Sequence, residues 1–155
     1  MSAGLLNRTA SFVETIQQGA TFLWRRRWGA YPRPIKVSSG RVVYADTGRP
    51  VSEDDFVPTD FTGCTARMQV RLTVLAPDVL LEFSTSPSNG QGAISLGSDG
   101  WVALSLSAAQ TAALPYGTGA GQWIEAIGQL EVEFADGTVV RLAEVRFVLS
   151  PEGTR

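Results

Sequence analysis

The chain has 155 residues, a length that suits one domain with one hydrophobic core. Its 13 basic and 15 acidic residues give a formal net charge of −2, which argues against nucleic acid as a general partner because phosphate binding needs a concentrated positive surface. Histidine is absent and Cys64 is the single cysteine. This composition excludes Ser-His-Asp and Cys-His mechanisms, the usual zinc sites and an internal disulfide.

The N-terminal residues are mostly small and polar, and residues 1–10 are predicted to form an arm that is ordered only where something holds it. No basic start is followed by an apolar run, so we expect no secretory signal. We also expect no membrane span, because no apolar segment is long enough to cross a bilayer. A first strand is predicted over residues 11–17.

A second strand is predicted over residues 21–28, where large apolar side chains recur at alternate positions. It contains three consecutive arginines. Alternation directs Arg25 and Arg27 outward and Arg26 toward the apolar face. That face would carry Phe22, Trp24 and Trp28.

Residues 29–59 are predicted to leave the core as an inserted excursion, because about thirty residues is long for a connection in a compact domain. The prolines near its start rule out a regular strand there. Residues 35–38 and 41–45 predict a small hairpin around Ser39-Gly40. Since long excursions on a rigid scaffold often carry contacts, this segment is a candidate binding region.

The core resumes with a strand over residues 64–74, in which Ala66, Met68, Val70 and Leu72 alternate with polar side chains. Further strands are predicted over residues 79–85, with Val79, Leu81 and Phe83 on one face, over 93–96, and over 101–106, with an Asp-Gly turn at 99–100.

A short helix is predicted over residues 108–114, because Ser107 and Gln110 form a capping-box pattern and Pro115 follows. A glycine-rich loop at 117–121 follows the helix. It is interpreted as a connection, since a phosphate-binding loop would precede a helix. Residues 123–134 and 138–149 then predict a long hairpin, with a β-bulge near Ala143-Glu144 where the alternation shifts by one residue.

This order predicts an all-β fold, an antiparallel immunoglobulin-like β-sandwich with one short helix and an inserted hairpin excursion. A closed barrel is the alternative architecture. The expected domain organisation is an arm at 1–10 and a single sandwich domain at 11–155, interrupted by the excursion at 29–59.

No catalytic, cofactor-binding or metal-ligating residue is predicted. Cys64 lacks a base and is interpreted as a packing residue. The acidic group at residues 53–55 and Asp60 lacks the spacing of an EF-hand loop, and a solvated loop is expected there. Candidate partner-contact residues are instead the outward arginines, the tyrosines of the excursion and two tryptophans at strand starts. They are Arg25, Arg27, Tyr31, Tyr44, Trp101 and Trp123.

Several short sequence motifs, here called landmarks, follow one another along the chain. They are Asp-Phe-Thr-Gly at 60–63 with Ala-Arg-Met-Gln-Val-Arg at 66–71; Ala-Ile-Ser-Leu-Gly at 93–97 with Gly-Trp-Val at 100–102; Leu-Ser-Ala-Ala-Gln-Thr-Ala-Ala-Leu at 106–114; Leu-Glu-Val-Glu-Phe-Ala-Asp-Gly at 130–137; and Val-Leu-Ser-Pro at 148–151 with Thr154 and Arg155. In this order they resemble small tail and baseplate proteins of tailed bacteriophages, in particular the N-terminal domain of upper baseplate proteins.

The resemblance covers about residues 11–155. It implies an immunoglobulin-like sandwich that docks onto the tail or baseplate and holds fibres or receptor-binding proteins. The excursion is longer than this pattern, and the chain ends without a fibre-forming extension, so the expected role is an adaptor. The implied location is the virion, after synthesis in the bacterial host cytoplasm. The implied partners are other virion proteins and further copies of the chain, with no nucleic acid, membrane, metal or cofactor.

Two other readings stay open. Within the virion, the chain could be a head-decoration or head-to-tail completion protein. From a different class, it could be a carbohydrate-binding module that uses Trp101 and Trp123. An enzyme is disfavoured by the absence of histidine and of paired carboxylates.

Overall fold

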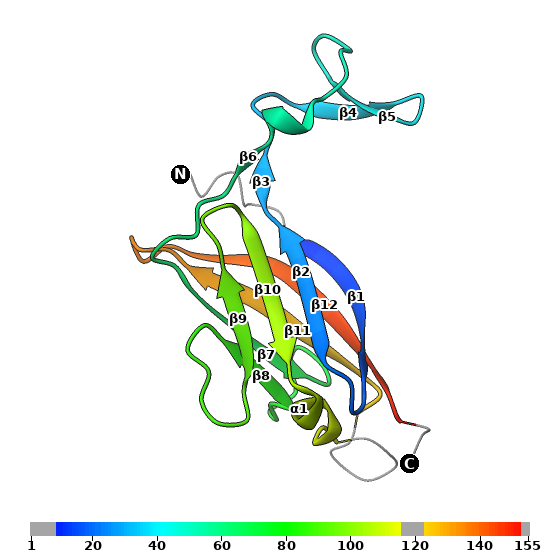
Figure 1. Ribbon diagram of the computed structural model, residues 1–155, viewed down its shortest axis with the longest axis vertical. Coiled ribbons are helices and arrows are strands. Elements are labelled where there is room, and N and C mark those ends of the chain that lie inside the picture. Colours follow the sequence, from blue (N-terminus) through cyan, green and yellow to red (C-terminus); the bar gives the residue numbers. More distant parts are fainter. Residues whose placement is uncertain (1–8, 116–122, 153–155) are drawn as a thin grey trace.

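The computed structural model describes residues 9–115 and 123–152 of the chain. Eight strands of this part form one continuous hydrogen-bonded sheet, here called the large sheet (Figure 1). Its strands are β1 (Ala10–Gln17), β2 (Phe22–Arg27), β7 (Thr65–Arg71), β8 (Leu81–Ser84), β9 (Gly92–Leu96), β10 (Trp101–Leu106), β11 (Glu125–Glu133) and β12 (Val139–Ser150).

The strands of the large sheet follow the order β1-β12-β11-β7-β8-β9-β10-β2. The sheet curls until it is barrel-like, with β9, β10 and β2 in front of β7, β11 and β12 in Figure 1. The predicted all-β class is confirmed, whereas the core strands of the described residues form one large sheet and not the two facing sheets of a sandwich. Two pairings, β1 with β12 and β8 with β9, are parallel. The expectation of a purely antiparallel fold is therefore wrong at these positions, where the paired strands are not joined by a tight turn.

The two end strands, β1 and β2, face each other across a seam without pairing in the ladder. Side chains fill this seam instead. The ring of Phe12 lies edge-on to Trp24 with centroids 5.3 Å apart, and Arg26 Nη2 lies 2.8 Å from Glu14 Oε1. Arg26 lies over the Trp24 ring, 5.5 Å from its centroid, as predicted, but its side chain stays exposed at the seam, where it helps to close the large sheet.

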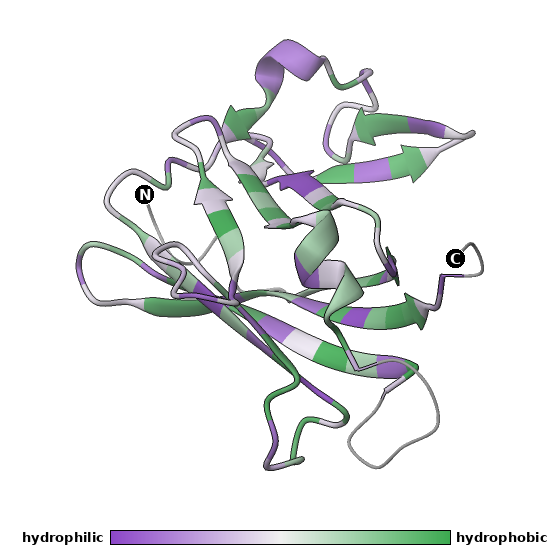
Figure 2. Ribbon diagram, turned by 60° about the horizontal axis from the view of Figure 1, so that its bottom comes forward, coloured by the Kyte–Doolittle hydropathy of each residue, from purple (hydrophilic) through white to green (hydrophobic). Residues whose placement is uncertain are grey.

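The core lies inside the curl and is built by alternation, as predicted for most strands. Ala66, Met68 and Val70 of β7 are buried, and Phe83 of β8 stacks on Phe147 of β12 with ring centroids 6.2 Å apart. Burying a side chain of this size contributes about 1.5–3 kcal/mol. Figure 2 shows the alternating hydropathy along these strands.

Two residues predicted to be inside the core lie at the surface. Leu72 and Val79 are exposed because β7 ends at Arg71 and β8 begins only at Leu81. Both side chains therefore belong to the loop that joins these strands. This loop, residues 72–80, is exposed over most of its length.

Helix α1 (Ala108–Ala112) carries the chain from β10, at the front of the large sheet, to β11 behind it. Its predicted capping box is confirmed: Gln110 N donates to Ser107 Oγ at 3.1 Å, and Ser107 N donates to Gln110 Oε1 at 2.8 Å. The buried Thr111 hydroxyl donates to Ala20 O at 2.8 Å, which ties the helix to the turn between β1 and β2. The predicted glycine-rich loop at 117–121 lies outside the described residues.

The hairpin of β11 and β12 contains the predicted bulge, one residue from its expected place. Leu130 pairs with Ala143 and Glu131 pairs with Arg141, so Leu142 is the extra residue. Leu142 and Ala143 are both buried although they are neighbours in sequence. The bulge thus keeps apolar side chains inward on both sides of the irregularity.

Residues 29–59 form a projection that stands off one end of the large sheet (Figure 1). A neck of two short strands, β3 (Gly29–Ala30) and β6 (Val57–Pro58), leads to it. Its outer part contains the hairpin of β4 (Ile35–Ser38) and β5 (Arg41–Tyr44), at the residues where a hairpin was predicted. A turn of 3-10 helix, η2 (Glu53–Asp55), brings the chain back to the neck.

Candidate functional site

An arginine–tryptophan contact lies on the outer face of β2 and β10. Trp101 pairs with Arg27 in the ladder, and Ala103 pairs with Arg25, so these side chains share one face. The guanidinium carbon of Arg25 lies 4.2 Å from the Trp101 ring centroid, and that of Arg27 lies 5.9 Å from it. The predicted outward direction of both arginines is confirmed.

The contact continues from the large sheet onto the projection. The guanidinium carbon of Arg27 is 5.0 Å from the ring centroid of Phe56, and Phe56 lies edge-on to Tyr31 with centroids 5.6 Å apart. Arg27 Nε also donates to Asp99 O at 2.8 Å. We call the set Arg25, Trp101, Arg27, Phe56 and Tyr31 the arginine–aromatic stack. It unites four of the six predicted contact residues.

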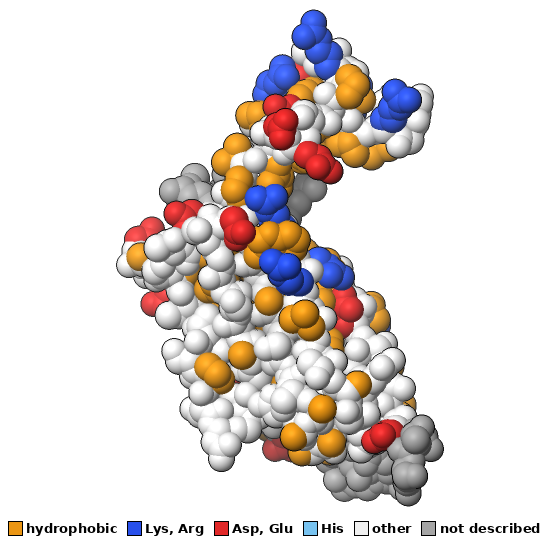
Figure 3. All heavy atoms as spheres, in the orientation of Figure 1, with side chains coloured by type: hydrophobic (Ala, Val, Ile, Leu, Met, Phe, Trp, Pro, Cys, Tyr) orange, Lys and Arg blue, Asp and Glu red, His pale blue; other side chains and the backbone are white. Residues whose placement is uncertain are grey.

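The stack combines positive charge with aromatic surface where the projection meets the sheet (Figure 3). Among the described residues, Arg26 is paired with Glu14, whereas Arg25 and Arg27 have no carboxylate partner. Arginine and aromatic side chains are the types enriched at binding hot spots. The stack can therefore bind a neighbouring surface, and Arg27 also fastens the projection to the sheet.

Phe56 was missed as a site residue by the sequence analysis. It directly follows the acidic residues of η2, and its contact with Arg27 joins positions 29 residues apart in the chain, as the numbering shows. No local pattern signals such a pairing. The ring of Phe56 packs tightly against the neck, because a Cβ on Gly29 would collide with it.

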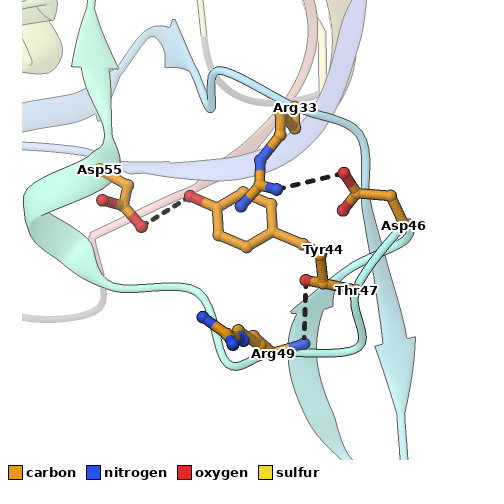
Figure 4. A network of polar contacts seen from close by, with 6 residues as sticks. All are labelled: Arg33, Tyr44, Asp46, Thr47, Arg49 and Asp55. Atoms are coloured by element: carbon orange, nitrogen blue, oxygen red, sulfur yellow. Dashed lines mark hydrogen bonds and ion pairs between the residues drawn. The ribbon is translucent and has the colours of Figure 1, made fainter.

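Tyr44 was predicted to contact partners but lies inside the projection (Figure 4). Its hydroxyl donates to Asp55 Oδ2 at 2.6 Å, and its ring lies 4.2 Å from the guanidinium carbon of Arg33, which is paired with Asp46 at 3.1 Å. The hydrogen bond to the Asp55 carboxylate raises the pKa of Tyr44, with a further contribution from burial. Tyr44 therefore organises the projection, and its predicted surface role is wrong.

Trp123 was also predicted to lie at the surface and is buried in the core instead. Its position before β11 places it at the end of the crossover, where the indole is covered by the large sheet. Among described atoms, its indole nitrogen has no hydrogen-bond partner. Since Trp101 is half-buried under Arg25, the pair of exposed tryptophans needed by the carbohydrate-binding alternative is not formed.

A second surface, also missed by the sequence analysis, lies on the hairpin of the projection. Ile35 pairs with Tyr44 and Val37 pairs with Val42, so these four side chains share one face. Ile35, Val37 and Val42 are exposed, with Val37 at 73%. We call these three residues the hairpin face. The alternation of apolar residues within the predicted hairpin could have revealed the hairpin face from the sequence.

The remaining polar candidates have structural roles. Asp60 Oδ1 accepts from the hydroxyl of Thr62 at 2.6 Å and from its N–H at 2.9 Å, and these hydrogen bonds lower the pKa of Asp60. Cys64 packs against the core, and burial raises the pKa of its thiol, as expected for a packing residue. In the described ranges, no three metal-ligating His, Cys, Asp or Glu side chains come together. No helix described in this chain has the length and apolar character that a bilayer crossing requires.

Comparison with protein-family models gives no match to this chain. A search of curated proteins likewise finds no similar protein.

Proposed function

We propose that this chain is a non-enzymatic virion structural protein of a tailed phage, acting in the tail or baseplate as an adaptor between the tail core and fibres or receptor-binding proteins. The order of sequence landmarks described above motivates the phage assignment. The observation that carries the binding role is the projection, which presents an uncovered apolar hairpin face away from the large sheet.

The exposed hairpin face supports a binding role on physical grounds. A two-stranded hairpin is marginally stable in water unless a further strand or a packed surface supports it. Tyr44 anchors one end of this face, but Val37 and Val42 remain open to solvent. Exposed apolar surface of this kind marks interaction sites in soluble proteins.

The arginine–aromatic stack supports the same proposal by fixing the projection in place. Arg27 contacts Trp101 and Asp99 of the sheet and Phe56 of the projection. Trp28 N donates to Gly100 O at 2.7 Å, and Thr59 N donates to Trp28 O at 2.9 Å. A projection that is held by side-chain and backbone contacts can fix the position of one neighbouring subunit relative to another. An adaptor must do this.

The proposal includes the immunoglobulin-like architecture of the phage domains, with the large sheet as a curled variant of two facing layers. Phe22 of β2 and Phe147 of β12 meet across the core with ring centroids 6.0 Å apart, as side chains of two facing layers do. The proposal assigns binding rather than catalysis because the chain has no histidine.

The test is the composition of purified particles. We expect mass spectrometry to find the chain in particles purified through a density gradient, and gold-labelled antibody to mark the tail or baseplate. A chain that is absent from particles contradicts the proposal. Label on the head would support the decoration or head-to-tail completion alternative instead.

A further inference from the structure

The connection between β8 and β9 carries an Asn-Gly pair at the centre of a tight turn. Gln91 N donates to Ser88 O at 3.0 Å, which closes a four-residue turn around Asn89 and Gly90. Gly90 has φ +85°, whereas Asn89 does not have a positive φ. A positive φ at the third residue alone is the mark of a type II turn. Both central residues are exposed to solvent.

Hydrogen bonds hold the ends of this turn and leave its centre free. Ser88 N donates to Gln91 Oε1 at 2.8 Å, and Gln91 O accepts from Gln110 Nε2 at 2.7 Å. Within the described residues, neither the side-chain amide of Asn89 nor the N–H of Gly90 has a hydrogen-bond partner. The peptide between these two residues can therefore rotate while the ends of the turn stay in place.

Rotation of the central peptide moves two reactive groups of this turn toward each other. In a type II turn the ψ of the second residue is about +120°, and in a type I turn it is about −30°, with the same closing hydrogen bond. The change brings the Gly90 nitrogen nearer to the side-chain carbonyl carbon of Asn89, as closure of a five-membered ring requires. Gly90 accepts either sign of φ and has no side chain to hinder the approach.

We propose that Asn89 is a site of spontaneous deamidation. The Gly90 nitrogen attacks Asn89 Cγ and gives up its proton to water or hydroxide, and the side-chain nitrogen takes up a proton and leaves as ammonia. Water then opens the resulting succinimide at either carbonyl, which leaves aspartate or isoaspartate at position 89. The overall reaction consumes one water, releases one ammonia and needs no oxidant or cofactor.

The modification changes the charge of a surface that has almost none. Residues 83–124 contain a single charged side chain, that of Asp99. Both products of the reaction carry a carboxylate at position 89, in the middle of the exposed turn. Deamidation therefore introduces a negative charge between residues 83 and 98, where the chain has no charged side chain.

Isoaspartate also alters the backbone, because the former side-chain methylene becomes part of the main chain. The longer turn no longer brings Gln91 N to Ser88 O, and it displaces Gln91 O from Gln110 Nε2. Gln110 forms the capping box of α1 with Ser107. The modification should therefore loosen the contact between this turn and the first turn of α1. Aspartate at position 89 should not, because it keeps the length of the main chain.

The test is incubation of the folded, purified protein at neutral and alkaline pH, followed by peptide mapping with mass spectrometry. We expect the peptide that contains Asn89 to gain one mass unit, and to do so faster as pH rises, because the attack requires removal of the Gly90 amide proton. An isoaspartate-specific methyltransferase should label the same peptide. Asn7, the only other asparagine, precedes Arg8 and is the internal control. It should react several-fold more slowly, because a side chain on the following residue hinders the attack.

Two variants at the exposed position 89 separate the chemistry from its structural effect. Asn89→Gln keeps an amide but would need a larger ring, so its mass should stay unchanged. Asn89→Asp carries the charge without the longer backbone, so hydrogen exchange in α1 should be faster in aged wild type than in this variant.

Three results would overturn the proposal. They are an Asn89 that keeps its mass in the folded protein while the urea-denatured chain is converted, equal rates at Asn7 and Asn89, and equal rates in wild type and Asn89→Gln. The proposal goes beyond the virion role, and these measurements on purified protein do not depend on that role.

Discussion

The backbone contacts that hold the projection against the large sheet can be tested at one glycine. Gly100 occupies the turn between β9 and β10 with φ +88°, and its carbonyl accepts the Trp28 N–H at 2.7 Å. A Cβ at this position would collide with the Trp28 carbonyl oxygen and lie 3.2 Å from Pro58 Cβ. Gly100→Ala should therefore push the neck of the projection away from the sheet.

Gly137 offers a matched control. It also follows an aspartate in a hairpin turn and has φ +86°, but a Cβ there would meet no atom within 4 Å. In Gly137→Ala, the left-handed backbone costs about 1–2 kcal/mol, of which about 0.4–1 kcal/mol is offset by the smaller entropy of the unfolded chain. The net loss of stability should be about 1 kcal/mol.

Gly100→Ala carries the same backbone cost and a further one. Displacing the Trp28 carbonyl disturbs two backbone hydrogen bonds, from Trp28 N to Gly100 O and from Thr59 N to Trp28 O. Each such bond contributes about 1 kcal/mol, and a polar group left unpaired costs more. The total loss should be about 3–4 kcal/mol. The difference of about 2–3 kcal/mol between the variants corresponds to about 4–12 °C in Tm for a domain of this size.

Urea denaturation at 25 °C, followed by tryptophan fluorescence, measures both variants against wild type. We expect a much lower midpoint for Gly100→Ala than for Gly137→Ala. Equal losses in the two variants would refute the reasoning, because they would mean that the turn at Gly100 does not fasten the neck.

Three further predictions concern single side chains. Cys64 should react slowly with a thiol reagent in the native protein and rapidly in denaturant, because burial raises its pKa; equal rates would contradict this. The Tyr44 phenol should ionise only above pH 10, since its hydrogen bond to Asp55 raises its pKa. The stability from that bond is therefore complete below pH 10 and is lost as pH rises through the raised pKa; ultraviolet titration should show a late component that Tyr44→Phe lacks, and its persistence in the variant would oppose the assignment. Arg27→Ala should lower stability by about 1–2 kcal/mol, and Arg25→Ala by about 0.5–1 kcal/mol, because Arg27 has an additional backbone hydrogen bond; the reverse order in urea denaturation would argue against Arg27 as the fastening residue.

Local patterns predicted the local structure of this chain well. The alternation in β7, the capping box of α1 and the hairpin of the projection all depend on residues close in sequence, and all are present. The main prediction was a sandwich, and a closed barrel was only the alternative. The curling of the strands into one barrel-like sheet depends on pairings between strands that are distant in sequence. The parallel pair of β1 and β12 joins residues more than a hundred positions apart, as the register shows.

The candidate site was predictable where side-chain direction follows from alternation. That rule placed Arg25 and Arg27 on the outer face, whereas their position beside Trp101 depends on the pairing of β2 with β10, which was not predicted. It could not reveal Phe56, whose contact crosses between the projection and the sheet. It also could not show that Trp123 is buried, because the burial of an indole before a strand depends on the elements packed over it.

The most direct test of the proposed adaptor role uses Lys36, the only lysine in the chain, which is exposed on β4 of the projection. Purified particles would be treated with an amine-reactive cross-linker, and linked peptides would be identified by mass spectrometry. The adaptor role predicts that Lys36 is linked to a tail, baseplate or fibre subunit. Links from Lys36 to head proteins alone, or particles that lack the chain, would contradict it.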